Sequence, residues 1–390
     1  MTQNATELAG LLVEQSSHAP SAAALPRLDA GLIAAADAIA RMRQGRSADI
    51  SHDGHVMRLW PVESLTLDDF EGLRQAYAGR LNLIITGTRA EALDLGADAD
   101  EVRVFRLNGH LTHMQLRRLV DPSLPGLVEL SKPLQPASLA APLAGGAVRL
   151  AKLAHLLPAV LSAELGDNEA EASPSADVRT LRDYPKLIAR TLQVVSHARV
   201  PLHNASHTKL AIFRPGDGGV EHMAITVGEP DFDQPVLCRL HSECFTGDVL
   251  GSMRCDCGEQ LQGAIARMHE AGGGVLLYLR QEGRGIGLAN KMRAYRLQDR
   301  GLDTVEANMD LGFEDDERQW YCAAHMLRLL GVRAVNLMTN NPNKVEAMRS
   351  LGVDVRERVA HQFEPNEHNR RYLRTKALRS GHMFGLDALQ

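Results

Sequence analysis

Three cysteines stand close together in the second half of the chain, within residues 239–260. Cys244, Cys255 and Cys257 follow the spacing C-x10-C-x-C. Thiolates are soft ligands that hold Zn²⁺ tetrahedrally, and a site with three protein ligands leaves a fourth position where water can be activated. The spacing therefore indicates a zinc site that is open for reaction.

The same stretch allows two other interpretations. His241 could act as a fourth ligand, which would close the site and make it structural. A cysteine can also be simply a small buried hydrophobe. We expect that role for Cys238 and Cys322, because apolar residues flank both of them.

A glycine-rich loop follows an apolar run within residues 275–288. Gly283, Gly285 and Gly287 stand between a predicted strand and a predicted helix. Backbone N–H groups at a helix N-terminus bind phosphate, and glycines let the backbone approach it. Arg284 could pair bidentately with phosphate oxygens. The pattern is neither the dinucleotide-binding motif nor a Walker loop, and a plain tight turn fits it equally well.

Two further polar clusters lie where helices are predicted to begin. Residues 339–344, Thr-Asn-Asn-Pro-Asn-Lys, suit a polar or phosphorylated ligand, although Asn-Asn-Pro is also common turn chemistry. Residues 314–318, Glu-Asp-Asp-Glu-Arg, are acidic, and a helix dipole favours carboxylates in its first turn. A solvated helix start is the simpler interpretation of this second cluster. Neither cluster defines a site by itself.

Strand and helix signals alternate around these clusters, which predicts a mixed α/β (α+β) fold. Short connections between the first strands of the second half predict antiparallel pairing there. In that half the predicted strands cover residues 210–213, 223–227, 236–240, 275–279, 334–338 and 353–356, and the predicted helices cover 259–271, 286–298, 318–330 and 342–351.

The chain of 390 residues is long enough for two domains. Residues 166–180 are acidic and rich in small side chains, so we expect a linker between domains at 1–165 and 181–390. Before the linker, the pattern predicts a helix at 32–44, strands at 83–86 and 102–105, and one or two buried helices within 139–165.

Composition restricts the partners and the location. The formal charge of −5 and the pI near 6.3 give no reason to expect nucleic acid or an anionic membrane as the main partner. The five cysteines, an odd and mostly clustered set, favour a reducing compartment over a disulfide framework. The start of the chain has no basic segment, and no apolar run reaches about 18 residues. We expect a cytoplasmic protein.

Six motifs occur in order within the second half: His-Ser-Glu-Cys-x-Thr-Gly-Asp, Arg-Cys-Asp-Cys-Gly, Arg-Gln-Glu-Gly-Arg-x-Ile-Gly-Leu, Asp-Thr-Val-Glu-Ala-Asn, Asp-Glu-Arg and Thr-Asn-Asn-Pro. Together they resemble GTP cyclohydrolase II of riboflavin biosynthesis. The match runs from about residue 210 to residue 384. This resemblance implies the family's cyclohydrolase fold for the second half, and a homodimer.

The resemblance implies that Cys244, Cys255 and Cys257 bind one catalytic zinc per chain. The water on that zinc would attack C8 of the guanine ring, open the imidazole and release formate. Zinc chemistry agrees, since zinc lowers the pKa of bound water to about 7. In base deaminases, water activated by a Cys₃-bound zinc attacks a carbon of the base. By the same resemblance, GTP contacts Arg239, Leu240, His241, Ser242, Glu243, Gln260, Glu282, Gly283, Arg284, Thr304, Thr339 and Lys344.

The family also releases pyrophosphate, and three further residues match its motifs. The resemblance implies that Asp316 accepts a proton, that Arg318 attacks the α-phosphate and that Tyr295 is the active-site tyrosine. A guanidinium with a pKa above about 12 is a poor nucleophile, so stabilisation of developing charge is an alternative role for Arg318. A Mg²⁺ ion on the triphosphate would serve the same end.

The first half resembles a decayed 3,4-dihydroxy-2-butanone 4-phosphate synthase, at residues 36–50 and 150–159. That enzyme needs an acidic Arg-Glu-Asn-Glu-Gly-Asp loop for Mg²⁺ and a later His-Thr-Glu. This chain has Ser-His-Asp-Gly-His at 51–55 and Leu-Ala-Gly-Gly at 143–146 instead. Without the carboxylates nothing holds a hard cation, so we expect a scaffold or dimerisation role.

Two other functions are compatible with the residues. One is a GTP-binding regulatory protein that keeps the fold and the zinc without turnover, although an open zinc position has no use in a pure binder. The other is a related ring-opening enzyme that acts on another base. Turnover of GTP, compared with uracil-type substrates, separates the three.

Overall fold

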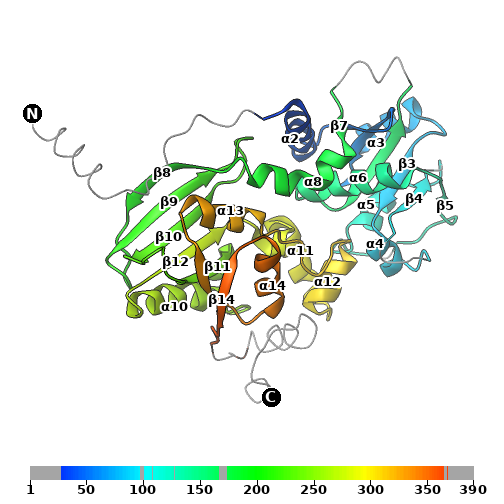
Figure 1. Ribbon diagram of the computed structural model, residues 1–390. Coiled ribbons are helices and arrows are strands. Elements are labelled where there is room, and N and C mark those ends of the chain that lie inside the picture. The colour runs from blue at the N-terminus through cyan, green and yellow to red at the C-terminus, as the bar shows by residue number, and fades with distance from the viewer. Residues whose placement is uncertain are drawn as a thin grey trace, which may run out of the picture.

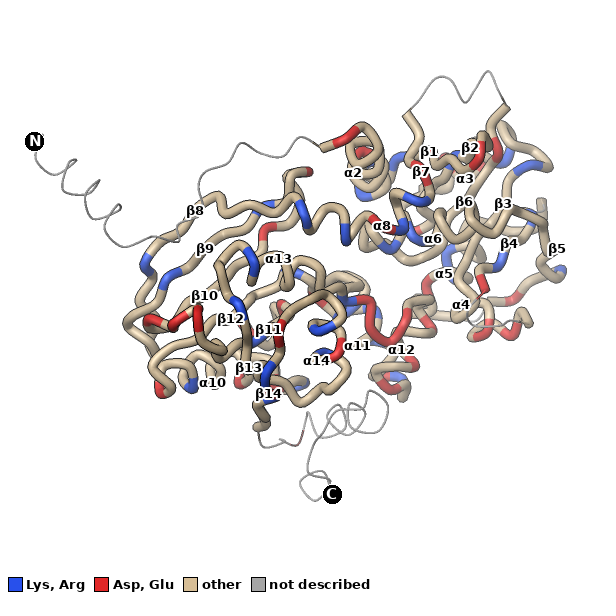
Figure 2. The backbone as a smooth tube through the Cα atoms, viewed as in Figure 1, with Lys and Arg blue, Asp and Glu red and all other residues tan. Residues whose placement is uncertain are grey.

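The computed structural model describes residues 28–96, 101–107, 109–126, 128–166, 174–363 and 367. These residues form two seven-stranded sheets with helices on their faces, so the mixed α/β prediction is confirmed (Figure 1). We refer to residues 28–189 as the N-terminal half and to residues 193–363 as the C-terminal half. Basic and acidic residues are both scattered over the two halves (Figure 2).

The N-terminal sheet has the strand order β5-β4-β3-β6-β2-β1-β7 and is antiparallel except for the parallel pair of β1 and β7. Its helices lie on both faces, since α2, α6 and α8 pack in one core cluster and α3 and α5 in the other, so the central strands β3 and β6 are buried on both sides. The strands are β1 (Ala48–His52), β2 (His55–Pro61), β3 (Asn82–Ile85), β4 (Arg103–Arg106), β5 (Gln135–Pro136), β6 (Ala159–Glu164) and β7 (Ala176–Asp177), and the helices are α2 (Ala30–Arg43), α3 (Leu67–Ala76), α4 (Gly87–Ala92), α5 (His113–Val120), α6 (Ala141–Leu153) and α8 (Val178–Ala189).

The C-terminal sheet has the order β14-β13-β11-β12-β10-β9-β8. As predicted, its first strands pair antiparallel, whereas β12, β11, β13 and β14 run parallel. Its strands are β8 (Gln193–Arg199), β9 (Thr208–Arg214), β10 (His222–Gly228), β11 (Val236–Ser242), β12 (Gly273–Leu279), β13 (Ala334–Met338) and β14 (Asp354–Val359), and its helices are α9 (Phe245–Asp248), α10 (Cys257–Glu270), α11 (Leu288–Gln298), α12 (Thr304–Asp310), α13 (Tyr321–Leu329) and α14 (Pro342–Ser350).

Helices α11 and α12 lie between the two sheets (Figure 1). Along β3, Ile84 belongs to the core cluster under α2, α6 and α8, whereas Leu83 and Ile85 face a second cluster. That second cluster also contains Ile286, Leu297, Phe313 and other side chains of the C-terminal half. The N-terminal sheet therefore buries one face against helices α11 and α12 and against Ile286 of the glycine loop.

Two predictions about local structure are wrong, and a third is confirmed in part. Residues 176–180 are not a linker, because β7 pairs with β1 and the Asp177 side chain caps α8 by accepting hydrogen bonds from the amides of Arg179 and Thr180. Residues 167–173 lie outside the described part of the chain. The apolar stretch 139–165 holds one helix, α6, and then a strand, β6.

The second error concerns residues 314–318, which precede a helix instead of starting it. Helix α13 begins at Tyr321. Carboxylates capture the nearby backbone amides: Asp316 Oδ1 accepts from the Arg318 amide at 3.1 Å, and Glu317 Oε1 accepts from the Glu314 amide at 3.0 Å. Such local bonds compete with helical ones and hold a loop.

Candidate active site

The predicted polar clusters meet at one edge of the C-terminal sheet. Strands β11, β12 and β13 run parallel, so their carboxyl ends lie together. Cys244 follows β11, Glu282 follows β12 and Thr339 follows β13. Ligands of α/β sheets bind outside the carboxyl ends of parallel strands. An open cavity lies here, of about 1180 Å³ when the solvent space at its mouth is included.

Almost the whole predicted set lines this cavity. The lining contains the three cysteines, Tyr295, Arg318 and the twelve residues predicted to contact GTP. Of the predicted site residues only Asp316 is missing from the lining, and it pairs with Arg318. Asn340 and Asn341 of the predicted cluster 339–344 also line the cavity. Arg254, Lys291, Gln298 and Asn308 line it as well, and no role was predicted for any of these four.

The three cysteine thiols converge at the end of β11 and the start of α10. Their sulfur atoms all lie within 4.8 Å of one another, and the Sγ atoms of Cys244 and Cys255 are 3.7 Å apart. Two thiolates on one tetrahedral zinc, each about 2.3 Å from the metal, are separated by about 3.8 Å. Gly247 passes so close that a Cβ atom there would lie 2.8 Å from the Cys255 sulfur. The donors thus fit a zinc ion.

Lys291 adds a positive charge to the thiols. Its Nζ atom is 3.1 Å from Cys244 Sγ and 2.9 Å from Glu282 Oε1. Hydrogen bonds from the other two thiols, aided by this ammonium group, hold the pKa of Cys244 well below its usual range. The shared bond with Cys244 raises the pKa of Cys255 to about 11. The cluster therefore already favours a thiolate at Cys244.

His241 is not placed as a fourth zinc ligand. Its Nε2 atom lies 3.0 Å from Asp248 Oδ1, and burial lowers the pKa of the imidazole. Asp248 Oδ2 also accepts from the Cys244 amide at 3.0 Å and from the Tyr278 hydroxyl at 2.9 Å. Among the residues that the structure describes, the candidate metal group consists of the three cysteines alone. Asp248 therefore positions the first cysteine, and the structural Cys₃His alternative is wrong.

Arg239 reaches the cavity from inside β11. Its Nη1 atom donates to the Met338 carbonyl at 2.9 Å, and Nη2 donates to the Gln260 side chain, which in turn bonds to Asp256. Burial lowers the pKa of this guanidinium to about 10. Its Nε atom is buried and, within the described residues, lacks a hydrogen-bond partner. An unpaired buried donor beside a cavity is a place for a ligand's acceptor.

The glycine loop is held by its own acidic residue. Glu282 Oε2 accepts from the Phe245 amide at 2.6 Å, and Oε1 accepts from the Gly283 amide at 2.9 Å. Arg284 has a positive φ of 60° and its Nη1 pairs with Asp315 Oδ1 at 2.5 Å. The predicted phosphate-binding guanidinium is therefore already bound to a carboxylate that neutralises part of its charge.

The loop before α13 brings Asp316 and Arg318 together. Arg318 Nε donates to Asp316 Oδ1 at 2.7 Å, and the guanidinium lies over the Trp320 ring, 5.2 Å from its centroid. Burial would raise the pKa of Asp316, but Arg318 outweighs it and the net pKa is lowered. Lys344 Nζ lies over the same ring at 4.7 Å. The indole thus gathers two cations at the cavity.

Tyr295 lies one turn after Lys291 on α11, on the face toward the thiols. Its ring has the Arg254 guanidinium 4.9 Å and the Lys291 ammonium 5.7 Å from its centroid. Burial raises the pKa of its hydroxyl to about 12. The phenol is therefore a hydrogen-bond donor throughout the neutral pH range.

Comparison with other proteins shows which family has this sequence. The family model "GTP cyclohydrolase II" matches residues 193–360. A GTP cyclohydrolase-2 of Azospirillum brasilense is 47% identical over 385 residues, which are 95% of this chain and 98% of that protein. The chain belongs to the GTP cyclohydrolase II family. It is accordingly an enzyme, a hydrolase of that family.

Other members differ in how much of this chain they match. A GTP cyclohydrolase-2 of Xylella fastidiosa strain Temecula1 is 36% identical over 360 residues, 90% of this chain and 87% of its own length. One from Pseudomonas paraeruginosa is 60% identical over 173 residues, which cover 84% of it but 44% of this chain. The two-part chain is thus shared with some members, whereas others match over fewer than half of its residues.

Among solved structures, a two-domain 3,4-dihydroxy-2-butanone 4-phosphate synthase from A. baumannii covers 84% of this chain and 99% of its own length at 13% identity, with a TM-score of 0.30. A cation-free 3,4-dihydroxy-2-butanone 4-phosphate synthase covers 39% of this chain and 96% of its own, again at 13% identity, with a TM-score of 0.31. At these scores the silent-synthase interpretation of the N-terminal half stays a prediction.

Two supporting residues of this family site escaped the sequence analysis. Lys291 stands four positions before Tyr295, and residues at that spacing share a helix face, so placing the tyrosine could have found the lysine. Asp248 closes the motif His-Ser-Glu-Cys-x-Thr-Gly-Asp. Its bond to the Cys244 amide depends on the short helix α9, which the sequence pattern did not predict.

Proposed function

We propose that this protein hydrolyses GTP by opening the imidazole ring of guanine, with release of formate and pyrophosphate. The product would be 2,5-diamino-6-hydroxy-4-(5-phosphoribosylamino)pyrimidine, and the step would be the first of riboflavin biosynthesis. One observation supports this proposal most: a three-thiol metal site and a set of arginine and lysine side chains line the same cavity. Such a cavity suits a substrate that has a reactive base at one end and phosphates at the other.

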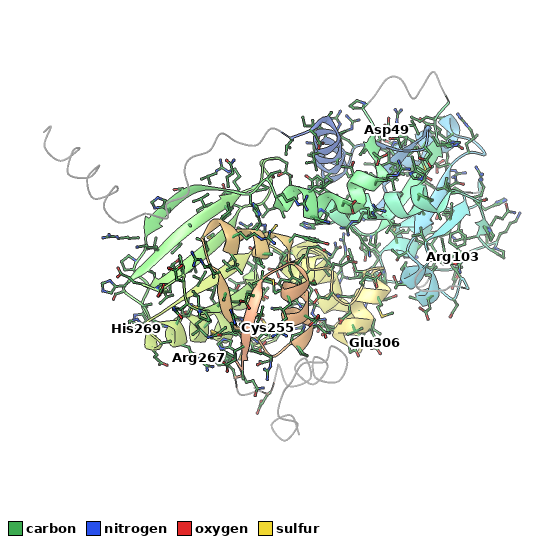
Figure 3. All side chains as sticks on the ribbon, viewed as in Figure 1. Asp49, Arg103, Cys255, Arg267, His269 and Glu306 are labelled. Atoms are coloured by element: carbon green, nitrogen blue, oxygen red, sulfur yellow. The ribbon has the colours of Figure 1, made fainter. Side chains whose placement is uncertain are left out.

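The base end of GTP would lie at the thiols. Zinc held by Cys244, Cys255 and Cys257 would supply Lewis-acid activation of water for attack on the ring carbon. Asp248 fixes the backbone of Cys244, and Lys291 offsets the thiolate charge. Tyr295 would donate a hydrogen bond to the reacting base. Figure 3 marks Cys255 among the elements of the C-terminal half.

The phosphate end would lie away from the thiols, toward the carboxyl end of β13, where Thr339 follows the strand. Arg239 supplies a buried donor without a protein partner among the described residues, and Lys344 supplies a cation. Thr339 and the amides of the glycine loop would complete the contacts. A Mg²⁺ ion on the triphosphate would neutralise further charge.

The geometry favours an electrostatic role for Arg318 in pyrophosphate release. Its guanidinium is paired with Asp316, and this carboxylate favours the charged form of the arginine. A charged guanidinium has no free electron pair for attack, but it stabilises charge that develops on the α-phosphate. Asp316 would orient Arg318 and accept a proton from an incoming water molecule.

Location and assembly stay predictions. The five cysteines are free, which agrees with a reducing compartment such as the cytoplasm. No helix in the described residues is long and apolar enough to span a membrane. We keep the homodimer as a proposal, and size-exclusion chromatography with light scattering would test it.

Incubation of the purified protein with GTP tests the proposed function. We expect one formate and one pyrophosphate per GTP, together with loss of the guanine absorbance. Tight binding of GTP with none of these changes would instead support the regulatory protein. Ring opening of a different base, with GTP left unchanged, would support the related ring-opening enzyme.

A further inference from the structure

The N-terminal half touches the C-terminal half directly behind the loop that carries Asp316 and Arg318. Lys152, in the last turn of α6, places its Nζ atom 2.5 Å from Glu317 Oε1 and 3.7 Å from Glu314 Oε1. The side chains of Lys152 and Glu317 are only 13% and 11% exposed. Glu317 stands between the two proposed catalytic residues, so its position bears on both.

Glu317 also joins this loop to the glycine loop. Its amide donates to the Arg284 carbonyl at 3.0 Å. At Gly285, where φ is +94°, a Cβ atom would lie 2.9 Å from the Glu317 carbonyl carbon and oxygen. The two loops therefore pack backbone to backbone. A change in the position of Glu317 must move the glycine loop or break this contact.

His155, two residues after the end of α6, contacts the start of α11 as well. The His155 carbonyl accepts from Asn290 Nδ2 at 3.0 Å. A Cβ atom at Gly287 would approach the His155 Cβ to 3.1 Å. Helix α11 carries Lys291 and Tyr295 toward the thiols. One short segment of the N-terminal half, residues 152–155, thus contacts elements that lead to both ends of the cavity.

We propose that Lys152 is a positioning residue for the Asp316 and Arg318 pair, so that the N-terminal half takes part in turnover although none of its described residues lines the cavity. This inference rests on the proposed function. The nearby cation Arg149 faces Glu317 too, but its Nε atom is buried without a partner among the described residues. Lys152 makes the close bond, and its loss leaves Glu317 buried with reduced compensation.

The test compares Lys152→Met with Arg300→Ala in the full-length protein. Arg300 makes a contact between the same two halves, donating to the carbonyls of Pro122 and Ser123 at 2.9 Å each. It does not line the cavity. Formate and pyrophosphate release, the KM for GTP, bound zinc and the thermal midpoint are measured for both variants.

We expect Lys152→Met to lower kcat for pyrophosphate release by about 10- to 100-fold, since small displacements of a catalytic group cost up to about that factor. Zinc content should stay complete and KM within about threefold, because the thiols and the remaining cations are untouched. Arg300→Ala should keep kcat within about twofold. The double variant Lys152→Glu with Glu317→Lys should recover part of the lost kcat, which loss of folding alone would not allow.

Three results would overturn the inference. They are a kcat of Lys152→Met within twofold of the wild type, an equal loss in Arg300→Ala, and a double variant no better than Lys152→Met. In each of these cases the wild type still turns over GTP, so the proposed function stands. A wild type that releases neither formate nor pyrophosphate would overturn the proposed function, and this inference with it.

Discussion

The charges around the thiols decide how single residues act at the site. Lys291 lies against both Cys244 and Glu282, and Tyr295 lies one turn further along α11. Interactions with the thiolate and the carboxylate outweigh burial and raise the pKa of Lys291 well above its usual range. The ammonium group therefore stays charged. It links the thiol cluster to the glycine loop through one side chain.

Tyr295 gives a prediction about pH. Burial raises its pKa to about 12, above the ordinary value of 10.0. In the folded protein the hydroxyl of Tyr295 therefore stays protonated at every pH below about 11. Tyr295→Phe removes this donor and should lower formate release by about 10²- to 10⁴-fold. The ratio of wild-type to variant rates should be the same at pH 7 and pH 9. A ratio that falls toward pH 9 would show that the phenol ionises there.

Cys255 gives the prediction about the metal. Cys255→Ser replaces one soft ligand by a hydroxyl, so bound zinc and formate release should both fall, the latter by at least about 100-fold. The matched control is Cys322→Ser, because Cys322 is a half-buried thiol on α13 outside the cavity. Metal analysis and a formate assay measure both variants. A metal-free Cys255→Ser protein that keeps its activity would refute the role given to this thiol.

At the scale of elements, the site depends on two loops that pack against each other after β12 and before α13. Gly285→Ala tests this contact. The new Cβ would clash with Glu317, and the positive φ adds about 1–2 kcal/mol of strain. We expect lower stability together with a marked fall in kcat. Gly54→Ala is the control, because φ there is +86° with nothing within 4 Å. It should lose similar backbone stability and keep kcat, and equal activities of the two variants would contradict the account.

The elements also show what the sequence could predict. The buried parallel strands β11, β12 and β13 are mostly apolar, so their positions and the polar residues after them were predictable. The start of α13 was not, because the bonds of Asp316 and Glu317 to local amides compete with a helix that the acidic pattern also favours. Helix α12 was missed because it has only seven residues and because its Ala307 packs in the cluster shared with the N-terminal half.

At the site, the limit of prediction has a similar cause. The cysteines could be recognised from their spacing, since two of them are almost adjacent in the chain. Lys152 could not, because its partner Glu317 is 165 residues away and meets it only through the packing of α6 against the C-terminal half. The ion pair of Arg284 with Asp315 could not be predicted either, because the two residues are distant in the chain. The sequence had suggested that the Arg284 guanidinium pairs with phosphate oxygens.

For the whole molecule, the main feature is a core cluster shared by the two halves. Phe313, only 1% exposed, belongs to the C-terminal half but packs in the cluster on the N-terminal sheet. Phe313→Ala should lower the free energy of unfolding by about 3–5 kcal/mol. Phe313→Leu keeps more of the buried volume and should cost less. Calorimetry should show one transition for the wild type, and two well-separated transitions would contradict a shared core.

The central claim is that the three thiols hold the metal that opens the guanine ring, in the same cavity that binds the phosphates of GTP. Zinc titration of metal-free protein, with formate release from GTP followed at each step, tests it most directly. The account predicts a rate that rises in proportion to bound zinc and levels off at one zinc per chain. Full formate release from the metal-free protein, or a rate independent of bound zinc, would contradict it.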